Sequence, residues 1–311
     1  MEVTKVIPRR LRPGDRIGIV SPSSPVTQER EEQFTKGLDF LDRLGLRCVI
    51  GSHVRSNTLG YAASPPQKAG DINRMFADPD INAIICTQGG VTANACLSFL
   101  DWDVIAGNPK IFAGISDITV LLNAIYTKTG LVTFHGNDLL WGFGRNPTPY
   151  DRSEFVRQLM DGCVGDIPAA GIRKTVRGGV AQGPLVGGNI SCLLKLAGTK
   201  YLPGFGGAVL FLEAIGISPE VCDHSFHQLK HIGVFDQIKG VLIGHIDGME
   251  NHSDMIQMED ILNSTTLEFG FPILKVADFG HNCPNTYLPV GATVRMDADN
   301  QRIEVVSQCL A

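Results

Sequence analysis

Short apolar runs alternate with amphipathic segments through the first half of the chain. The apolar runs predict buried strands at 16–20, 49–50, 83–86 and 110–114. Between them, apolar residues recur every three or four positions, which is the spacing of one helix face. These helical segments span 28–44, a stretch opened by Ser64-Pro65-Pro66, and 118–129. Strands that alternate with helices predict a mostly parallel sheet flanked by helices.

The pattern changes beyond residue 142. The stretch 142–179 is rich in Gly, Pro and charge, with one short amphipathic helix expected near 153–160. Strand candidates then dominate, at 209–212, 241–243, 273–276, 293–296 and 303–306. A length of 311 residues suits two domains. We therefore expect an α/β protein in which a sheet-and-helix N-terminal domain (1–160), a linker (161–179) and a smaller, strand-rich C-terminal α/β domain (180–311) follow one another.

Charge and composition narrow the class of partner. The chain has 27 basic and 32 acidic residues, a net charge of −5, and no basic stripe of the kind that binds nucleic acid or a membrane surface. It has no apolar run of membrane-spanning length, and its N-terminus is polar. We expect a cytoplasmic protein with a small-molecule partner, such as a small peptide or peptide conjugate, and we keep a homodimer open.

The cysteines and histidines give little sign of metal or disulfide chemistry. No CxxC pair occurs among the eight cysteines, which are Cys48, Cys86, Cys96, Cys163, Cys192, Cys222, Cys283 and Cys309. We expect them to be reduced, structural thiols. His224, His227 and His231 share the spacing of one helix face and could converge on a metal, but a solvated helix face is the more common explanation. We predict neither a metal nor a cofactor.

A small-residue turn at 113–119 holds the first candidate for chemistry. It places Ser116 between a predicted strand and a predicted helix, where backbone N–H groups stabilise developing negative charge. Ser116 and Asp117 would serve equally well as helix caps. Glu213 and His281 follow strand candidates further along, and the order Ser, acid, His is that of hydrolases with a nucleophile on such a turn.

Other residues compete for these roles. His135 ends a strand candidate shortly after Ser116 and is a rival general base. The turn from Thr87 to Gly90 could bind phosphate, although it lacks the Walker lysine. Glu213 taken alone could be a solvated acid at a strand end.

Four ordered blocks resemble the LD-carboxypeptidase family, which includes muramoyl-tetrapeptide carboxypeptidases and the microcin C self-immunity peptidase. The blocks are Gly114-Ile115-Ser116-Asp117-Ile118-Thr119, Gly187-Gly188-Asn189-Ile190-Ser191, Val209-Leu210-Phe211-Leu212-Glu213, and Gly280-His281 with Leu288-Pro289-Val290-Gly291. The resemblance implies a serine carboxypeptidase or amidase with Ser116 as nucleophile, His281 as general base and Glu213 as its carboxylate partner. We expect the backbone N–H groups of Gly90 and Asp117 to form the oxyanion hole.

Two departures from the family bear on the substrate. The glycine turn here is Gln88-Gly89-Gly90-Val91-Thr92, closer to the microcin immunity branch than to the Arg-Gly-Gly-Tyr-Gly of tetrapeptide carboxypeptidases. That branch has an interdomain tryptophan for a nucleotide base, whereas 161–179 has no aromatic residue and offers Arg173, Lys174 and Arg177 for a terminal carboxylate. We expect small peptides to be preferred over nucleotide conjugates unless Trp141 or Phe143 supplies a ring. A catalytically silent ligand-binding relative is the remaining alternative.

Overall fold

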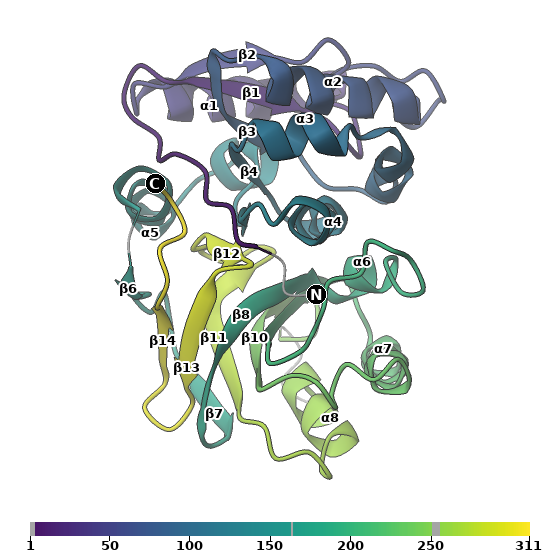
Figure 1. Cartoon of the computed structure of the whole chain (residues 1–311), viewed down its shortest axis with the longest axis vertical. Coiled ribbons are helices and arrows are strands. Elements are labelled where there is room, and N and C mark those ends of the chain that lie inside the picture. The colour runs from purple at the N-terminus through teal and green to yellow at the C-terminus, as the bar shows by residue number, and fades with distance from the viewer. Residues whose placement is uncertain (1–3, 163, 251–255) are drawn as a thin grey trace.

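The chain folds into two α/β halves stacked on each other (Figure 1), and the α/β class expected from the sequence is confirmed. A computed structural model describes residues 4–162, 164–250 and 256–311. In Figure 1 the N-terminal half, coloured purple to teal, lies above the C-terminal half, and α4 (Thr119–Thr129) and β12 (Leu288–Val290) lie at the junction. The candidate chemistry collects near this junction.

The N-terminal half is built on a six-stranded sheet of order β12-β5-β4-β3-β1-β2. Its own strands are β1 (Arg16–Val20), β2 (Arg47–Ile50), β3 (Ile81–Cys86), β4 (Ile111–Gly114) and β5 (Thr133–His135). These five are parallel, while β12 arrives from late in the chain and pairs antiparallel with β5. The carboxyl ends of the parallel strands share one edge, where ligands bind in such sheets.

Local signals set the helices that flank this sheet. They are α1 (Glu31–Asp42), α2 (Pro65–Ala77), α3 (Trp102–Gly107), α4 and α5 (Pro149–Phe155), with shorter turns η1 (Gln28–Arg30), η2 (Ala93–Phe99), η3 (Ser116–Ile118), η4 (Leu139–Phe143) and η5 (Val156–Asp161). A capping box of Ser64 and Gln67 starts α2. The helix expected near 153–160 starts earlier, because Thr148 and Asp151 form a capping box ahead of α5.

The C-terminal half is built on an eight-stranded sheet of order β6-β14-β13-β8-β9-β10-β11-β7. Its strands are β6 (Gly165–Asp166), β7 (Lys174–Arg177), β8 (Val180–Asn189), β9 (Val209–Ile215), β10 (Gly240–Asp247), β11 (Ile273–Gly280), β13 (Thr293–Asp297) and β14 (Arg302–Val305), and its helices are α6 (Ile190–Leu194), α7 (Pro219–His231) and α8 (Met258–Thr265). The segment 161–179, expected as a linker, thus contributes β6 and β7 to the two edges of this sheet.

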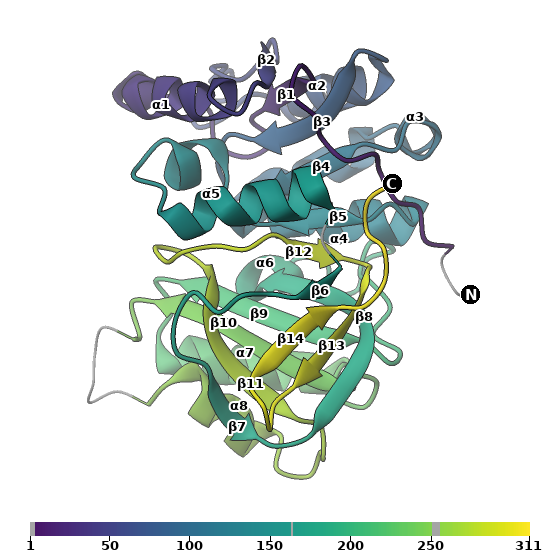
Figure 2. The ribbon, with the colours of Figure 1, turned by 90° about the vertical axis from the view of Figure 1, so that its left-hand side faces the viewer.

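The two halves share a hydrophobic core. One cluster of buried side chains includes Ile19 and Phe112 from the first sheet and Phe211 and Val294 from the second. Figure 2 shows β12 lying between α5 and the second sheet, so the chain leaves one sheet at β11, pairs with the other at β12 and returns at β13. None of the described helices is both long and apolar enough to cross a bilayer.

Candidate active site

Ser116 lies on a sharp turn at the carboxyl end of β4. Its backbone has a φ of 65°, in the left-handed region that side chains other than glycine rarely adopt. The turn leads directly into η3 and α4, so the hydroxyl stands at the start of a helix. Its Oγ has no hydrogen-bond partner among the described residues, and the side chain lines a pocket. The turn therefore presents an accessible hydroxyl at the N-terminal end of a helix.

Asp117 is fully buried and anchors the turn. Its Oδ1 accepts a hydrogen bond from Lys195 Nζ at 2.6 Å, and its Oδ2 accepts from Ser23 Oγ at 2.6 Å and from the backbone N–H of Ala93 at 2.7 Å. These partners come from the loop after β1, from η2 and from the end of α6. The carboxylate therefore fixes three segments around Ser116. Because the Asp117 side chain is fully engaged in these bonds, only the backbone N–H of Asp117 can act on a ligand.

The glycine turn after β3 packs directly against Ser116. A Cβ atom on Gly89 would lie 2.6 Å from the Cβ and 2.8 Å from the Oγ of Ser116, so only glycine fits there. Gly90 has a φ of 143° and lines the pocket, and its N–H has no hydrogen-bond acceptor in the described part of the chain. The predicted oxyanion donor Gly90 thus lies at the pocket beside the turn that bears Ser116.

Glu213 and His281 form a hydrogen-bonded pair across two neighbouring segments. Nδ1 of His281, which follows β11, lies 2.5 Å from Oε2 of Glu213 on β9. Glu213 is fully buried. Burial by itself would raise the pKa of Glu213, but the charge of His281, the neighbouring His135 and the hydrogen bond to His281 lower it to about 2. Burial opposes the charged imidazole too, yet the charge of Glu213 and the shared hydrogen bond raise the pKa of His281 above 6.5.

The loop that carries His281 is closed by hydrogen bonds. Asn285 accepts from the N–H of Gly280 at 2.9 Å and donates to the carbonyl of Gly280 at 2.9 Å. The N–H of Asn285 in turn donates to Oδ1 of Asp151 on α5 at 2.8 Å. The imidazole is thereby positioned by both halves of the molecule. This constraint was not visible in the sequence, because Asp151 and Asn285 are 134 positions apart.

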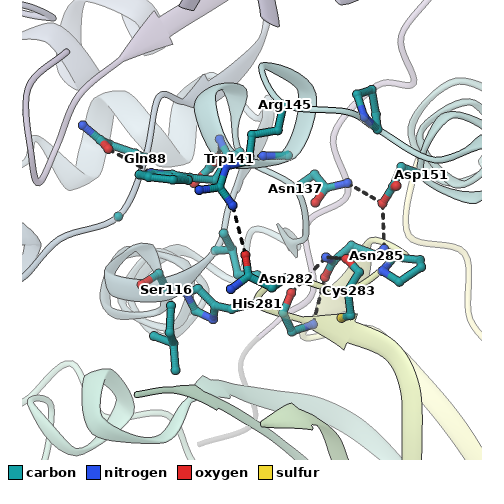
Figure 3. A pocket seen from close by; sticks show the side chains of 18 of the residues that line it. Gln88, Ser116, Asn137, Trp141, Arg145, Asp151, His281, Asn282, Cys283 and Asn285 are labelled. Atoms are coloured by element: carbon teal, nitrogen blue, oxygen red, sulfur yellow. Dashed lines mark hydrogen bonds between the residues drawn. The ribbon is translucent and has the colours of Figure 1, made fainter. Parts of the chain in front are cut away.

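These groups surround one pocket of about 690 Å³ (Figure 3). Ser116 and His281 lie at one end of the view, while Trp141 and Arg145 lie along another wall. Trp141 Nε1 donates to Gln88 Oε1 at 3.0 Å, and the guanidinium carbons of Arg145 and Arg30 lie 4.2 and 4.3 Å from its ring centre. The pocket therefore combines a candidate nucleophile, a candidate base and an arginine held against an indole.

Asp138 is a second buried acid of the pocket wall. Its Oδ1 accepts from the N–H of Trp141 at 2.7 Å and of Gly142 at 3.2 Å, as the cap of η4. Burial raises the pKa of Asp138 to about 6, although these N–H groups and the charges of His281 and Arg145 act to lower it. Near neutral pH this acid adds to the field that favours a charged His281.

The structure removes several competing candidates from the pocket. His135 is fully buried and does not line it, and the His135 Nε2 atom is 3.9 Å from Glu213 Oε1, beyond hydrogen-bond range. The cations offered for a terminal carboxylate are committed elsewhere: Arg173 pairs with Asp278, Lys174 with Glu259, and Arg177 bonds to carbonyls beside α8. That expectation is wrong: β7 pairs with the first residues of β11, at the opposite end of that strand from His281, and none of the three cations lines the pocket.

The remaining aromatic, histidine and cysteine expectations are resolved in the same way. Phe143 is buried and stacked on Phe40, so it offers no ring to a ligand. His227 on α7 lies 3.7 Å from Asp223, and no group of three or more potential ligands is placed to hold a metal within the described ranges. Cys48, Cys86, Cys96, Cys192, Cys222 and Cys283 are reduced thiols, and Cys163 lies outside the described ranges.

Comparisons with known proteins agree with this architecture. Models of the LD-carboxypeptidase N-terminal and C-terminal domains match residues 17–136 and 182–296. The microcin C7 self-immunity protein MccF of Escherichia coli is 29% identical over 96% of this chain and 95% of its own length. A probable murein peptide carboxypeptidase of Bacillus subtilis is 30% identical over 93% of this chain and 91% of its own.

Solved structures give the same answer. MccF in complex with glutamyl sulfamoyl guanosine superposes with a TM-score of 0.90 at 30% identity, covering 98% of this chain and 99% of that one. An MccF-like protein from Bacillus anthracis gives a TM-score of 0.87 at 30% identity, covering 97% and 99% of the two chains. Sequence and structure together establish that this chain belongs to the LD-carboxypeptidase family.

Proposed function

We propose that this protein is a serine carboxypeptidase or amidase that hydrolyses a C-terminal amide bond of a small peptide. The observation that carries the proposal is the 2.5 Å hydrogen bond between buried Glu213 and His281, which lines the same pocket as Ser116 on its left-handed turn. Because Nδ1 of His281 donates to Glu213, Nε2 is left as the acceptor for the proton of Ser116. With a pKa of about 2, Glu213 is ionised at neutral pH and stabilises the imidazolium.

The reaction follows from these roles. His281 takes the proton as Ser116 Oγ bonds to the carbonyl carbon, and the N–H groups of Gly90 and Asp117 stabilise the oxyanion. When the C–N bond breaks, His281 returns that proton to the leaving amine. A water molecule then attacks the acyl-enzyme with His281 as base, which releases the acid and restores Ser116.

A second candidate is hydrolysis of peptidyl- or aminoacyl-nucleotide amides. It is supported by the likeness to MccF, whose solved complexes contain glutamyl sulfamoyl guanosine and aspartyl sulfamoyl adenosine. One observation favours the peptide: the Trp141 ring already has two guanidinium groups over it. A base could stack on that indole only by displacing one of them.

The test uses Ser116→Ala, His281→Ala and the double variant. Each single change should lower kcat/KM by about 10³-fold or more, with little further loss in combination, because residues of one catalytic unit are not additive. Peptides and aminoacyl-nucleotide amides serve as competing substrates, and a fluorophosphonate probe should label the protein only when Ser116 is present. Full activity of Ser116→Ala would refute the nucleophile, and an unlabelled, inactive wild type would indicate a silent ligand-binding relative.

A further inference from the structure

Arg145 occupies a distinctive place in the pocket. It lies between η4 and α5, beside Trp141 in Figure 3, and lines the same pocket as Ser116 and His281. Its Nη1 donates to Oδ1 of Asn282 at 3.2 Å, and Asn282 directly follows His281. The guanidinium is therefore held within reach of a ligand that contacts the candidate catalytic histidine.

The charge of Arg145 is not neutralised by an acid. Across the described ranges no carboxylate lies within ion-pair distance of it, whereas Arg173 pairs with Asp278 at 2.7 Å. The acids of the pocket wall are engaged otherwise: Asp138 accepts two backbone N–H groups, and Asp151 accepts from Asn137 Nδ2 at 2.7 Å as well as from the loop after His281.

The surroundings of Arg145 orient its guanidinium but leave several of its N–H donors without a partner within the residues that the structure describes. Stacking on the Trp141 ring at 4.2 Å engages the flat face of the group and leaves its edge, where the N–H donors lie, available. Trp141 itself is fixed by Gln88, whose Nε2 donates to the Pro25 carbonyl at 2.7 Å. Arg30 over the same ring adds a second positive charge nearby. The result is a pre-oriented cation with unused donors.

We propose that Arg145 is the specificity-determining residue that binds the free terminal carboxylate of the substrate. The inference rests on the proposed peptidase function and gives that function its requirement for a free carboxyl end. A planar guanidinium matches the two oxygens of a carboxylate, and charge-assisted bonds of this kind change affinity by about 10- to 100-fold. The role expected for Arg173, Lys174 and Arg177 thus passes to a residue before the 161–179 segment.

Binding to the Ser116→Ala variant tests this without turnover. The ligands are N-acetyl-trialanine peptides with an L or a D residue at the C-terminus, each as the free acid and as the C-terminal amide, measured by isothermal titration calorimetry. We expect at least one free acid to bind about tenfold or more tighter than its amide. The preference should vanish in Ser116→Ala/Arg145→Gln. It should persist in Ser116→Ala/Arg30→Gln, which removes the cation outside the pocket lining.

Several outcomes would overturn the proposal. Equal binding of acid and amide, a preference that survives Arg145→Gln, or no binding by any of the four peptides each contradicts it. Adenosine monophosphate is titrated in parallel; if Arg145→Gln weakens only this ligand, the residue recognises a phosphoryl group and not a carboxylate. Because the proposed hydrolysis is judged by serine labelling and turnover of wild type, a failure of the carboxylate site is distinguishable from a failure of that function.

Discussion

Replacing Ser116 by glycine should stabilise the protein relative to replacement by alanine. Both changes remove the hydroxyl, so they differ chiefly in what the backbone tolerates at a φ of 65°. A left-handed conformation costs a residue with a Cβ about 1–2 kcal/mol. Against this gain, glycine makes the unfolded chain more flexible, which lowers the free energy of unfolding of the glycine variant by about 0.4–1 kcal/mol. We therefore expect Ser116→Gly to be more stable than Ser116→Ala by about 1 kcal/mol.

Urea denaturation at equilibrium measures the difference, provided that both variants unfold with the same m-value. Ser153 supplies a matched control, since it is exposed within the regular helix α5. There the sign should reverse, with glycine less stable than alanine by about 1 kcal/mol. If Ser116→Gly is no more stable than Ser116→Ala while the Ser153 pair behaves as expected, the turn stores no backbone strain and this reasoning fails.

Two further predictions concern the histidines. Since neutral His281 must accept the proton and its pKa is raised, kcat/KM should increase with pH through a midpoint above 6.5, and Glu213→Gln should move that midpoint to lower pH; a profile that stays flat between about pH 5 and pH 9 with chemistry rate-limiting would exclude the role. His135→Phe should lower kcat/KM less than about tenfold and leave the urea midpoint unchanged or higher, because both ring nitrogens of His135 lack hydrogen-bond partners in the described structure. A loss as large as that of His281→Ala would instead make His135 the base.

The sequence predicted the elements whose pattern is strong. The strands that became β1, β3, β4, β9 and β11 each contain a largely apolar run, and Ser64 with the two prolines after it is a typical start signal for α2. By contrast, β8 was missed because its Gly187-Gly188 pair weakens a strand pattern. These glycines are explained only by tertiary packing: a Cβ on Gly188 would collide with Thr119 of α4.

The residues of the candidate site likewise fall into a predictable and an unpredictable group. Ser116 and His281 follow recognisable strands and Glu213 lies near the end of one, so their placement near strand ends could be predicted. Trp141 lies on η4 and Arg145 in the Gly- and Pro-rich stretch that follows, and the path of both depends on hydrogen bonds with distant residues, such as those between Gln88 and Trp141 and between Arg145 and Asn282. Local pattern contains no information about such contacts, and for this reason the carboxylate-binding cation was sought in the wrong segment.

The pairing of β12 with β5 has a consequence for how activity arises during synthesis. Ser116 and its glycine turn leave the ribosome long before His281, and the loop bearing His281 is bracketed by β11 in one sheet and β12 in the other. A nascent or truncated chain that lacks β12 can therefore present the nucleophile without an oriented base. Hydrolysis by the proposed triad would therefore require this late strand to have docked.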